Sequence, residues 1–404
     1  MDPQNMPFHA TVALVDWTMP GHHDTYMRLF IRTLLDSGHQ VIALWPAPEQ
    51  LLDSEKLQHE TTSGEKKTPR FATAYFSRSK YPLWPSSLRY WAEAKTAARY
   101  IREALASCEK QLGAKCDFIF FNTFYEKQYW LVKALANACG RPWSFLYLHT
   151  SSLPPHSCEN PNIMQLLQHP MLRAVGVLDE RSIAPGEYMT GRKFVHFPDF
   201  TNEKYEENHP FERDLRAFKG NAPLILAIGH LQKAKGIMTL AELALNSSSS
   251  HLKFAFVGEG RLKRGTLRSV VKLLRNKPNV LFKLGRIPDG VAYNACIHAS
   301  DILFAAYHDF AHSSNTLTKA AVFERPVIVS DGHLMAERTR KYRLGEIVKQ
   351  KDPESALEGI IRITNDYQGW VSRNKPEWNT YRQLHSTAQM KCAFASLLSA
   401  YGLG

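Results

Sequence analysis

The chain has 404 residues, more than one ordinary hydrophobic core accommodates, so two domains are expected. A hydrophobic content of 44% and a charged content of 22% are typical of a globular protein and exclude a disordered one. Lys and Arg outnumber Asp and Glu by 12, that is 50 against 38, so anionic ligands or surfaces are expected partners. No nucleic-acid-binding module accompanies this charge, and we expect no nucleic-acid partner.

Cysteine usage and hydropathy indicate the compartment. The six cysteines form no CxxC pairs, which argues against a zinc site or a disulfide framework and suits a reducing cytosol. The sequence starts without the basic-then-apolar pattern of a signal peptide, and no apolar run approaches the length that spans a membrane. We therefore expect a cytoplasmic protein without a structural metal.

The first half begins in the manner of a doubly wound α/β fold. Residues 10–17, ATVALVDW, form a predicted strand, and a turn over 19–24 follows. A helical stripe of apolar residues then runs to about Gly38, and residues 40–45 are the next predicted strand. Gly21 in the turn either lets a ligand approach the backbone or only closes a tight turn.

A basic and aromatic segment follows a polar loop at 49–70. Residues 78–105 combine Arg and Lys with Tyr and Trp, and from about Ser86 they are predicted to be helical. One interpretation is peripheral association with an anionic membrane. The other is a solvated helix whose aromatic residues face the core.

Further apolar strands and a charged linker complete the first half. The predicted strands are CDFIFFNTF (116–124), PWSFLYLHT (142–150), 172–178 and 194–197, and near-continuous apolar runs indicate a sheet covered on both faces. Residues 201–222 are highly charged and lack a long apolar run, so we place the interdomain linker there.

The second half again alternates predicted strands and helices. Strands are predicted at 223–229, 252–260 and 279–285, and Glu377 to Tyr401 is predicted to be one long closing helix. The most informative stretch is 301–331, in which two apolar strands flank a helix from Asn315 to Phe323 and so form a βαβ unit. Ser313 or Asn315 caps that helix, whose N-terminus either is merely capped or also seats an anion such as phosphate.

Five motifs in the correct order resemble a known family. They are GHLQKAKG (229–236), FAFVGEG (254–260), VLFKLGRIPDG (280–290), KAAVFERPVIVSD (319–331) and, in the first half, FLYLHTSS (145–152). Together they resemble the family-four retaining glycosyltransferases of GT-B fold. The resemblance covers most of 223–365 well and the first half only in outline.

The resemblance implies a fold and a separate binding role for each domain. The fold class is α/β, with two doubly wound, Rossmann-like domains facing a cleft. Residues 1–205 are the expected acceptor-side domain, and residues 206–376 are the expected nucleotide-sugar domain. The closing helix, 377–401, is expected to pack back on the first domain. The implied substrates are a UDP- or GDP-linked sugar and a glycan, lipid-linked or small-molecule acceptor, with no cofactor and no metal in the chemistry.

Candidate donor-site residues follow from the matched motifs. Lys235 is the predicted point charge on the diphosphate, and His230 stands where the family usually has arginine. The remaining predicted phosphate and nucleoside contacts are Ser313, Ser314, Asn315, Gly258, Arg286, Ile287 and Lys319.

Candidate acceptor-side and catalytic residues lie in both halves. His149 ends an apolar strand and corresponds to the family's active-site histidine. The first glycine turn offers Gly21, His22, His23 and Asp24 to meet the acceptor or serve as its base.

Two glutamates of the family are replaced in this sequence. Their positions hold Ala311 and Lys319, which lack a carboxylate, and Asp309 is the predicted catalytic substitute for the first. The replacement keeps a second hypothesis open, in which the chain is a catalytically weak or inactive partner subunit or nucleotide-sugar sensor. A nucleotide-sugar epimerase of GT-B fold is the third.

Overall fold

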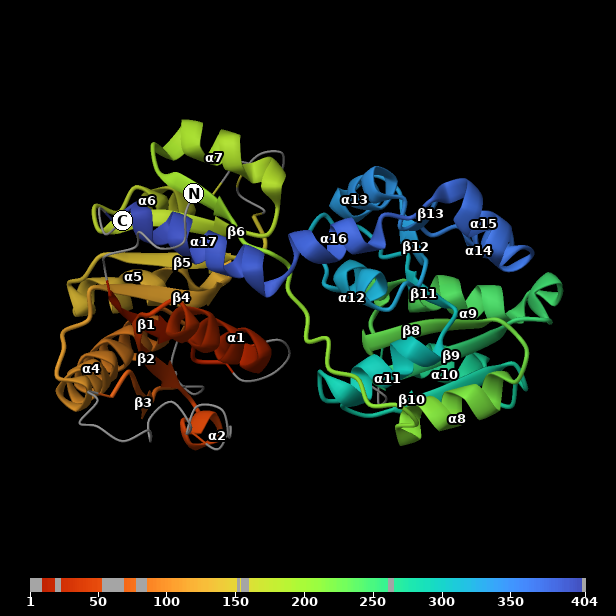
Figure 1. The fold of residues 1–404 in the computed structure, drawn as a ribbon, viewed down its shortest axis with the longest axis horizontal. Helices are drawn as coiled ribbons and strands as arrows, with labels where there is room; N and C mark the ends of the chain where they lie inside the picture. Colours follow the sequence, from red (N-terminus) through yellow and green to blue (C-terminus); the bar gives the residue numbers. More distant parts are fainter. Residues whose placement is uncertain are drawn as a thin grey trace. The chain divides into compact units, whose positions relative to one another are not determined.

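The protein, represented by a computed structural model, folds into two compact units. The structure describes residues 9–18, 23–52, 69–77, 86–150, 153, 160–260 and 265–401. Unit 1 comprises Met1–Pro198 and Ser386–Gly404, and unit 2 comprises Asp199–His385. Each unit is a parallel β-sheet with helices on both faces (Figure 1), so the chain has the predicted α/β class with two Rossmann-like halves.

Unit 1 contains a seven-stranded sheet in the order β3-β2-β1-β4-β5-β6-β7. Its strands are β1 Thr11–Val15, β2 Gln40–Trp45, β3 Phe71–Tyr75, β4 Phe118–Phe124, β5 Trp143–Tyr147, β6 Leu172–Val177 and β7 Lys193–His196. Its helices are α1 His23–Asp36, α2 Glu49–Leu52, α4 Ser86–Leu112, α5 Tyr129–Cys139, α6 Pro161–Leu167, α7 Ile183–Thr190 and α17 Thr387–Ser399, with 3₁₀ turns η1 Glu126–Gln128 and η2 Glu180–Ser182.

The sequence of β4 explains how both faces of this sheet are filled. Side chains alternate along a strand, so Phe120 and Phe121 point to opposite faces. Phe120 packs edge-on against Phe30 of α1 and Phe394 of α17, with ring centroids 5.7 and 5.4 Å away. Phe121 packs against Trp143 of β5 on the other face, 5.8 Å between centroids. Aromatic residues thus anchor α1 and α17 to the same face of the sheet.

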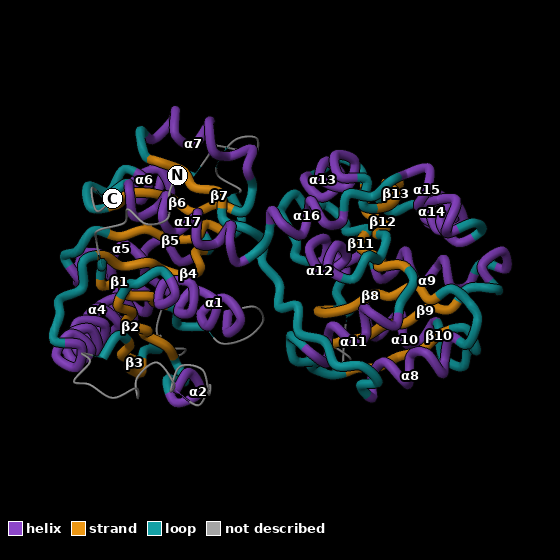
Figure 2. The backbone as a smooth tube through the Cα atoms, viewed as in Figure 1, coloured by secondary structure: helices purple, strands orange, loops and turns teal. Residues whose placement is uncertain are grey.

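Unit 2 contains a six-stranded sheet in the order β10-β9-β8-β11-β12-β13 (Figure 2). Its strands are β8 Leu224–His230, β9 Lys253–Glu259, β10 Val280–Leu284, β11 Ile302–Ala305, β12 Val327–Ser330 and β13 Gly345–Val348. Its helices are α8 Pro210–Lys219, α9 Ile237–Leu245, α10 Thr266–Leu273, α11 Val291–Ala299, α12 Thr316–Val322, α13 Leu334–Tyr342, α14 Pro353–Thr364, α15 Tyr367–Asn374 and α16 Trp378–Leu384, with 3₁₀ turns η3 Lys233–Lys235 and η4 Ser247–Ser249.

Two glycines allow β8 and β9 to approach closely at their carboxyl ends. Gly229 and Gly258 are register partners, and a Cβ built on Gly258 would lie 2.0 Å from the Gly229 carbonyl oxygen. Gly258 also has φ +131°, a conformation that side chains rarely adopt. Gly258 is therefore required by backbone packing, independently of any role in nucleoside binding.

Two predicted segments differ from the structure. Residues 201–222, predicted as a linker, contain α8, because Phe211, Leu215 and Phe218 form an apolar stripe at helical spacing among the charges. The predicted single helix over 377–401 is wrong, since it breaks into α16 and α17. Ser386 starts the second helix by accepting a hydrogen bond from the Gln389 N–H, and Ser-x-x-Gln is a capping-box sequence.

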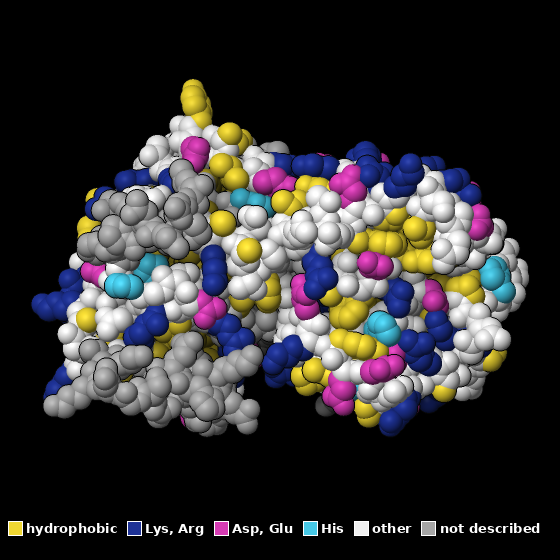
Figure 3. All heavy atoms as spheres, in the orientation of Figure 1, with side chains coloured by type: hydrophobic (Ala, Val, Ile, Leu, Met, Phe, Trp, Pro, Cys, Tyr) yellow, Lys and Arg dark blue, Asp and Glu magenta, His cyan; other side chains and the backbone are white. Residues whose placement is uncertain are grey.

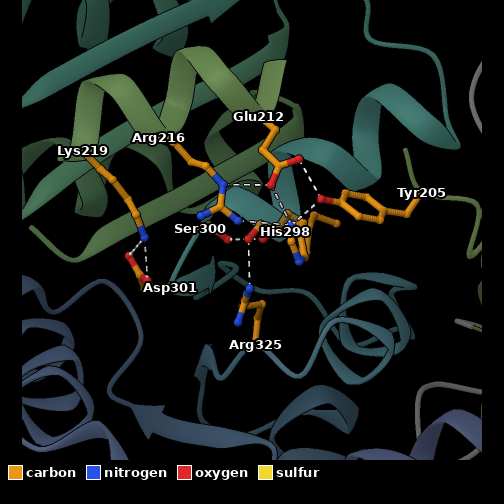
Figure 4. A network of polar contacts seen from close by, with 9 residues as sticks. Tyr205, Glu212, Arg216, Lys219, His298, Ser300, Asp301 and Arg325 are labelled. Atoms are coloured by element: carbon orange, nitrogen blue, oxygen red, sulfur yellow. Dashed lines mark hydrogen bonds and ion pairs between the residues drawn. The ribbon is translucent and has the colours of Figure 1, made fainter. Parts of the chain in front are cut away.

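A buried carboxylate fixes α8 to α11 at the opposite end of the unit 2 sheet from the glycines. Glu212 is 3% exposed and accepts hydrogen bonds from Tyr205 Oη at 2.7 Å and Arg216 Nε at 2.8 Å. Its Oε1 also lies 2.8 Å from His298 Nδ1, and Figure 4 shows these groups converging on the carboxylate. Burial raises the pKa of Glu212, but the hydrogen bonds from Tyr205, His298 and Arg216 outweigh burial and lower it to about 2.

This lowered pKa predicts how the stability of unit 2 depends on pH. A carboxyl whose pKa is lower in the folded state stabilises the fold above its unfolded value, about 4.5, and loses that contribution as the pH falls towards 2. We expect Glu212→Gln to lower the free energy of unfolding by on the order of 2–3 kcal/mol at pH 7, and the gap to wild type to close between about pH 4.5 and pH 2. Urea unfolding across pH measures this gap. The exposed Glu358→Gln is the control, and a gap independent of pH would contradict the assignment.

Candidate functional site

Strand order places one crevice in each unit. In unit 1 the chain moves outward from β1 through β2 to β3, then restarts with β4 on the other side of β1. In unit 2 it moves from β8 to β10, then restarts with β11 on the other side of β8. In open parallel sheets ligands bind at the carboxyl ends of the strands where the order reverses. The candidate sites are therefore the carboxyl ends of β1 and β4 and of β8 and β11.

Lys235 lies at the crevice of unit 2. It is half-buried at the end of η3, directly before Gly236, which has φ +68°. A Cβ on Gly236 would lie 2.2 Å from the Ala306 carbonyl oxygen, so only glycine lets this turn pack against the chain leaving β11. The ammonium lies 3.8 Å from the centroid of the Tyr307 ring and 5.2 Å from that of Phe310.

Tyr307 responds to the charge of Lys235. Burial raises the pKa of the phenol, but the Lys235 charge and hydrogen bonds from neighbouring groups lower it below its ordinary value. One neighbour is Thr316, whose Oγ1 lies 3.0 Å from Tyr307 Oη. Lys235 is thus a half-buried cation held over an aromatic face, which is a suitable position for binding an anion.

Lys319 is buried rather than exposed to a ligand. Its side chain is 1% exposed, and Nζ donates to Asp289 Oδ1 at 2.9 Å and to Asn294 Oδ1 at 3.1 Å. Burial lowers the pKa of the ammonium, and the Asp289 carboxylate opposes that effect. Nζ also lies 4.9 Å from the Tyr293 ring centroid, and the Tyr293 hydroxyl would lie 3.0 Å from a Cβ on Gly229. Lys319 therefore braces α12 against the segment that leads into α11.

The other predicted phosphate contacts have partners within unit 2. His230 is exposed, and its Nδ1 lies 3.8 Å from Glu259 Oε1 at the end of the neighbouring strand. Ser313 Oγ donates to Asp199 Oδ2 at 2.6 Å and accepts a hydrogen bond from Arg338 Nη1. A phosphate would therefore compete with existing hydrogen bonds at Ser313.

The start of α12 is capped differently from the prediction. Ser314 Oγ donates to Thr316 Oγ1 at 3.1 Å and lies 3.4 Å from the Thr316 N–H. Asn315 makes no side-chain capping hydrogen bond and has helical backbone angles. The hydroxyl of Ser314, rather than the amide of Asn315, is thus the group nearest to the first helical N–H.

Asp309, the predicted substitute carboxylate, lies on an exposed turn. Its side chain is 74% exposed, its φ is +51°, and Lys351 Nζ donates to its Oδ2 at 2.8 Å. The hydrogen bond from Lys351 lowers the pKa of the carboxyl. The predicted nucleoside contacts Arg286 and Ile287 directly follow β10, with Arg286 exposed and Ile287 packed against the unit 2 core.

The crevice of unit 1 gathers two of the predicted histidines. Tyr125, which follows β4, lies between His23 and His149, with ring centroids 6.4 and 5.7 Å away. His149 is half-buried after β5. Asp24 instead pairs with Arg28 one helical turn later, at 2.9 Å. Gly21 and His22 lie outside the described residues.

Sequence reasoning missed several polar residues of these crevices. Asp16 and Thr123 in unit 1, and Tyr307 and Asp289 in unit 2, were not singled out. Asp16 and Tyr307 could have been found from the sequence, because each comes at the end of the apolar run of a strand. Parallel sheets place polar ligand contacts at that end of their strands.

Comparison with known proteins finds one family model that matches part of unit 2. Residues 222–366 match the family model described as "Glycosyl transferases group 1". This range contains the turn with Lys235, the helix with Lys319 and the exposed Asp309. A search of curated protein sequences gives no match.

Solved structures share the fold of almost the whole chain. The sucrose-phosphate synthase (tll1590) of Thermosynechococcus elongatus is 17% identical, with a TM-score of 0.67 over 97% of this chain and 100% of that one. Anabaena Alr3699/HepE in complex with UDP and glucose is 14% identical, with a TM-score of 0.67 and the same coverage.

A third example is a UDP-forming trehalose-phosphate synthase of Burkholderia xenovorans. It is 12% identical, with a TM-score of 0.68 over 98% of this chain and 99% of that one. At these identities the likeness defines the fold, which is that of the GT-B glycosyltransferases.

In the described part of the chain, no helix is long and apolar enough to cross a membrane.

The buried pair of Lys319 and Asp289 predicts a large effect on stability. Lys319→Met removes the cation that pairs with the Asp289 carboxylate, whose side chain is 16% exposed. Breaking a buried pair from one side costs several kcal/mol, so we expect the free energy of unfolding to fall by about 3 kcal/mol. The matched control is Lys351→Met, which breaks an exposed pair and should shift nothing measurable. Chemical unfolding compares the two, and equal midpoints would refute a bracing role for Lys319.

Proposed function

We propose that this chain is a glycosyltransferase that transfers a sugar from a nucleotide sugar to a hydroxyl acceptor. The observation that carries the proposal is Lys235, a half-buried cation at the crevice of the unit that matches the group 1 glycosyl transferases. Transfer from a nucleotide sugar leaves a diphosphate with growing negative charge, and a fixed cation in a crevice stabilises that charge most effectively. UDP is the proposed leaving group, because the similar Anabaena and Burkholderia proteins are described with UDP.

The finer features of the proposal come from the sequence motifs. We infer transfer with retention and without a metal, in which Lys235 and His230 would meet the charge of the diphosphate. A protonated His230 would add a second positive charge beside the diphosphate, and Glu259 Oε1 lies 3.8 Å from its Nδ1. The proposed acceptor is a glycan or a lipid-linked sugar at unit 1, and the proposed location is the cytoplasm, at the inner face of the membrane.

A second candidate function is that of a protein with the same fold that does not catalyse sugar transfer. Ala311 and Lys319 provide no carboxylate where the resemblance implies one, and the ammonium of Lys319 is occupied by Asp289 and Asn294. This observation favours a nucleotide-sugar sensor or a partner subunit. The two candidates differ in turnover: a sensor binds UDP-glucose without consuming it, whereas an enzyme hydrolyses it slowly even with water as the acceptor.

Lys235 supplies the direct test of the donor site. We expect Lys235→Ala to weaken UDP binding by on the order of 1.5–3 kcal/mol and to leave uridine binding nearly unchanged, because only the diphosphate loses a charge-assisted contact. Titration calorimetry with both ligands measures the difference. Lys233→Ala is the control, since Lys233 is an exposed neighbour in the same turn. Equal weakening of UDP and uridine would remove Lys235 from the phosphate site.

The membrane association that we propose rests on α4. Trp91 is 62% exposed with Lys95 Nζ 5.0 Å from its ring centroid, and Tyr100 is 39% exposed with Arg99 5.1 Å from its centroid. Exposed aromatic rings beside cations suit the interface of an anionic bilayer. In the view of Figure 3, Lys and Arg side chains are scattered over both units, so the aromatic residues rather than charge alone single out this helix.

Vesicle binding tests this surface. We expect Lys95→Gln, Arg99→Gln and Arg102→Gln together to reduce cosedimentation with phosphatidylserine vesicles at low salt, because each cation contributes about 1 kcal/mol near an anionic surface. The control removes the same charge from unit 2 at the exposed residues Lys272, Arg275 and Lys277. Equal losses in both variants would indicate attraction by net charge alone and would count against α4.

A further inference from the structure

A cavity of about 400 Å³ lies at the amino end of the unit 2 sheet, opposite to the crevice with Lys235. The segments that lead into the adjacent strands β8, β11 and β12 line it, together with the end of α14 and the start of α15. A volume of this size suits a small organic molecule rather than a single ion. The lining residues include Lys219, Asp301, Ile302, Arg325, Ile363 and Tyr367.

One arginine of this cavity has a buried hydrogen-bond donor without an acceptor. Arg325 Nη2 donates to the His298 carbonyl oxygen at 2.9 Å (Figure 4). Arg325 Nε is buried and, among the residues that the structure describes, has no acceptor. A buried donor that stays unpaired costs free energy, so such a group is expected to meet a water molecule or a ligand.

The cavity has one net positive charge. Asp301, the carboxylate in its lining, accepts from Lys219 Nζ at 2.8 Å with both oxygens. Asp301 Oδ2 also accepts from the Leu224 N–H at 2.7 Å. Lys219 and Asp301 therefore balance each other. Within the described ranges, Arg325 forms no ion pair with a carboxylate, so its charge is the one left over.

A phenol and two buried aliphatic side chains form another part of the wall. Burial raises the pKa of Tyr367, the Arg325 charge opposes burial, and two nearby carboxylates raise the pKa further. The phenol is therefore neutral at neutral pH and offers a hydroxyl near the guanidinium. Ile302 and Ile363 are buried and give the cavity an apolar surface. The cavity thus combines a cation, a hydroxyl and an apolar wall.

The arginines of a second cavity in unit 2, of about 480 Å³, are paired with carboxylates. Arg362 Nε donates to Glu346 Oε2 at 2.9 Å, and Arg373 Nη1 donates to Asp366 Oδ2 at 3.2 Å. An anion would compete with these carboxylates. No such competition exists at Arg325, so the cavity at the amino end of the sheet is the better anion site.

We propose that this cavity binds a small organic anion, a phosphate monoester or a carboxylate, whose charged end meets Arg325. A guanidinium binds either oxyanion through its parallel N–H donors. The carbon skeleton of the ligand lies against Ile302 and Ile363, where apolar contact adds affinity. The site lies at the other end of the sheet from the proposed donor site, and the inference does not rest on the proposed function.

Water is the competing occupant of the cavity. Ordered water molecules would satisfy Arg325 Nε and fill the same volume without any ligand. The two interpretations differ in whether an organic anion binds and in whether its affinity depends on Arg325.

Titration calorimetry of the full-length protein separates these interpretations. The probes are phenyl phosphate and benzoate, which share an apolar ring and differ in the anionic group, and phenol is the neutral control. We expect at least one of the two anions to bind, and phenol to bind about 10-fold more weakly or not at all. Arg325→Gln should lower the affinity of that anion by about 10-fold or more. Arg362→Gln, in the second cavity, is the matched control and should leave the affinity unchanged.

A second variant keeps the test decisive if Arg325→Gln weakens the fold. Ala222 also lines the cavity and is half-buried, so Ala222→Phe narrows the space and keeps the guanidinium. It should weaken binding of the same anion. Saturating UDP or Lys235→Ala should leave this binding in place, because the donor crevice lies at the other end of the sheet.

Three outcomes would overturn the proposal and leave the cavity to water. They are binding of neither anion, binding that is unchanged in folded Arg325→Gln and Ala222→Phe, and binding that is lost with UDP or in Lys235→Ala. Failure of the wild-type protein to bind UDP would instead reject the proposed donor site and would leave the anion site unaffected.

Discussion

Covering a parallel sheet on both faces is the constraint on which the rest of this structure depends. Strands such as β4 and β9 are buried almost throughout, because helices occupy both of their faces. In β4 the two polar side chains, Asn122 and Thr123, lie towards the carboxyl end. The carboxyl ends collect Asp16, His23 and Lys235, whereas the amino end of the unit 2 sheet holds Glu212 and its network. Two sheets with the same pattern thus create one polar crevice each.

Within unit 2, several residues of the matched motifs also serve the packing of the fold. Glycine is required at 258 and 236, because a Cβ there would lie 2.0 Å from the carbonyl oxygen of Gly229 and 2.2 Å from that of Ala306. The Lys319 ammonium donates hydrogen bonds to Asp289 and Asn294. A glycine or a lysine that matches a ligand-binding motif therefore also serves the fold, and the energetic effect of replacing it contains both contributions. Lys235 differs, since its described contacts are to the side chains of Tyr307 and Phe310, including a hydrogen bond to the Tyr307 phenol, rather than to a carboxylate.

The sequence predicts the fold better than it predicts the candidate site. Apolar runs such as residues 118–124 identify the strands, because a doubly covered strand leaves no polar position. Helix α8 was not predicted, because its three large apolar residues are separated by charged ones in a highly charged segment. The contact of Thr123 with Asp16 joins residues 107 positions apart, and no local pattern encodes it. The burial of Lys319 likewise depends on Asp289, 30 positions earlier, so its charge suggested a ligand contact that the structure uses internally.

The course of the chain has a consequence for synthesis. Unit 2 is inserted into unit 1, and its two ends adjoin, because the Asp199 N–H donates to His385 Nδ1 at 2.9 Å. On the ribosome, unit 2 is therefore a contiguous segment that can fold as soon as it emerges. Unit 1 must wait for α17, and until then the rings of Phe30, Phe120 and Phe197 lack the Phe394 side chain that packs against all three. The nascent first half thus exposes an aromatic surface through the synthesis of nearly two hundred further residues, which makes it a natural client for chaperones.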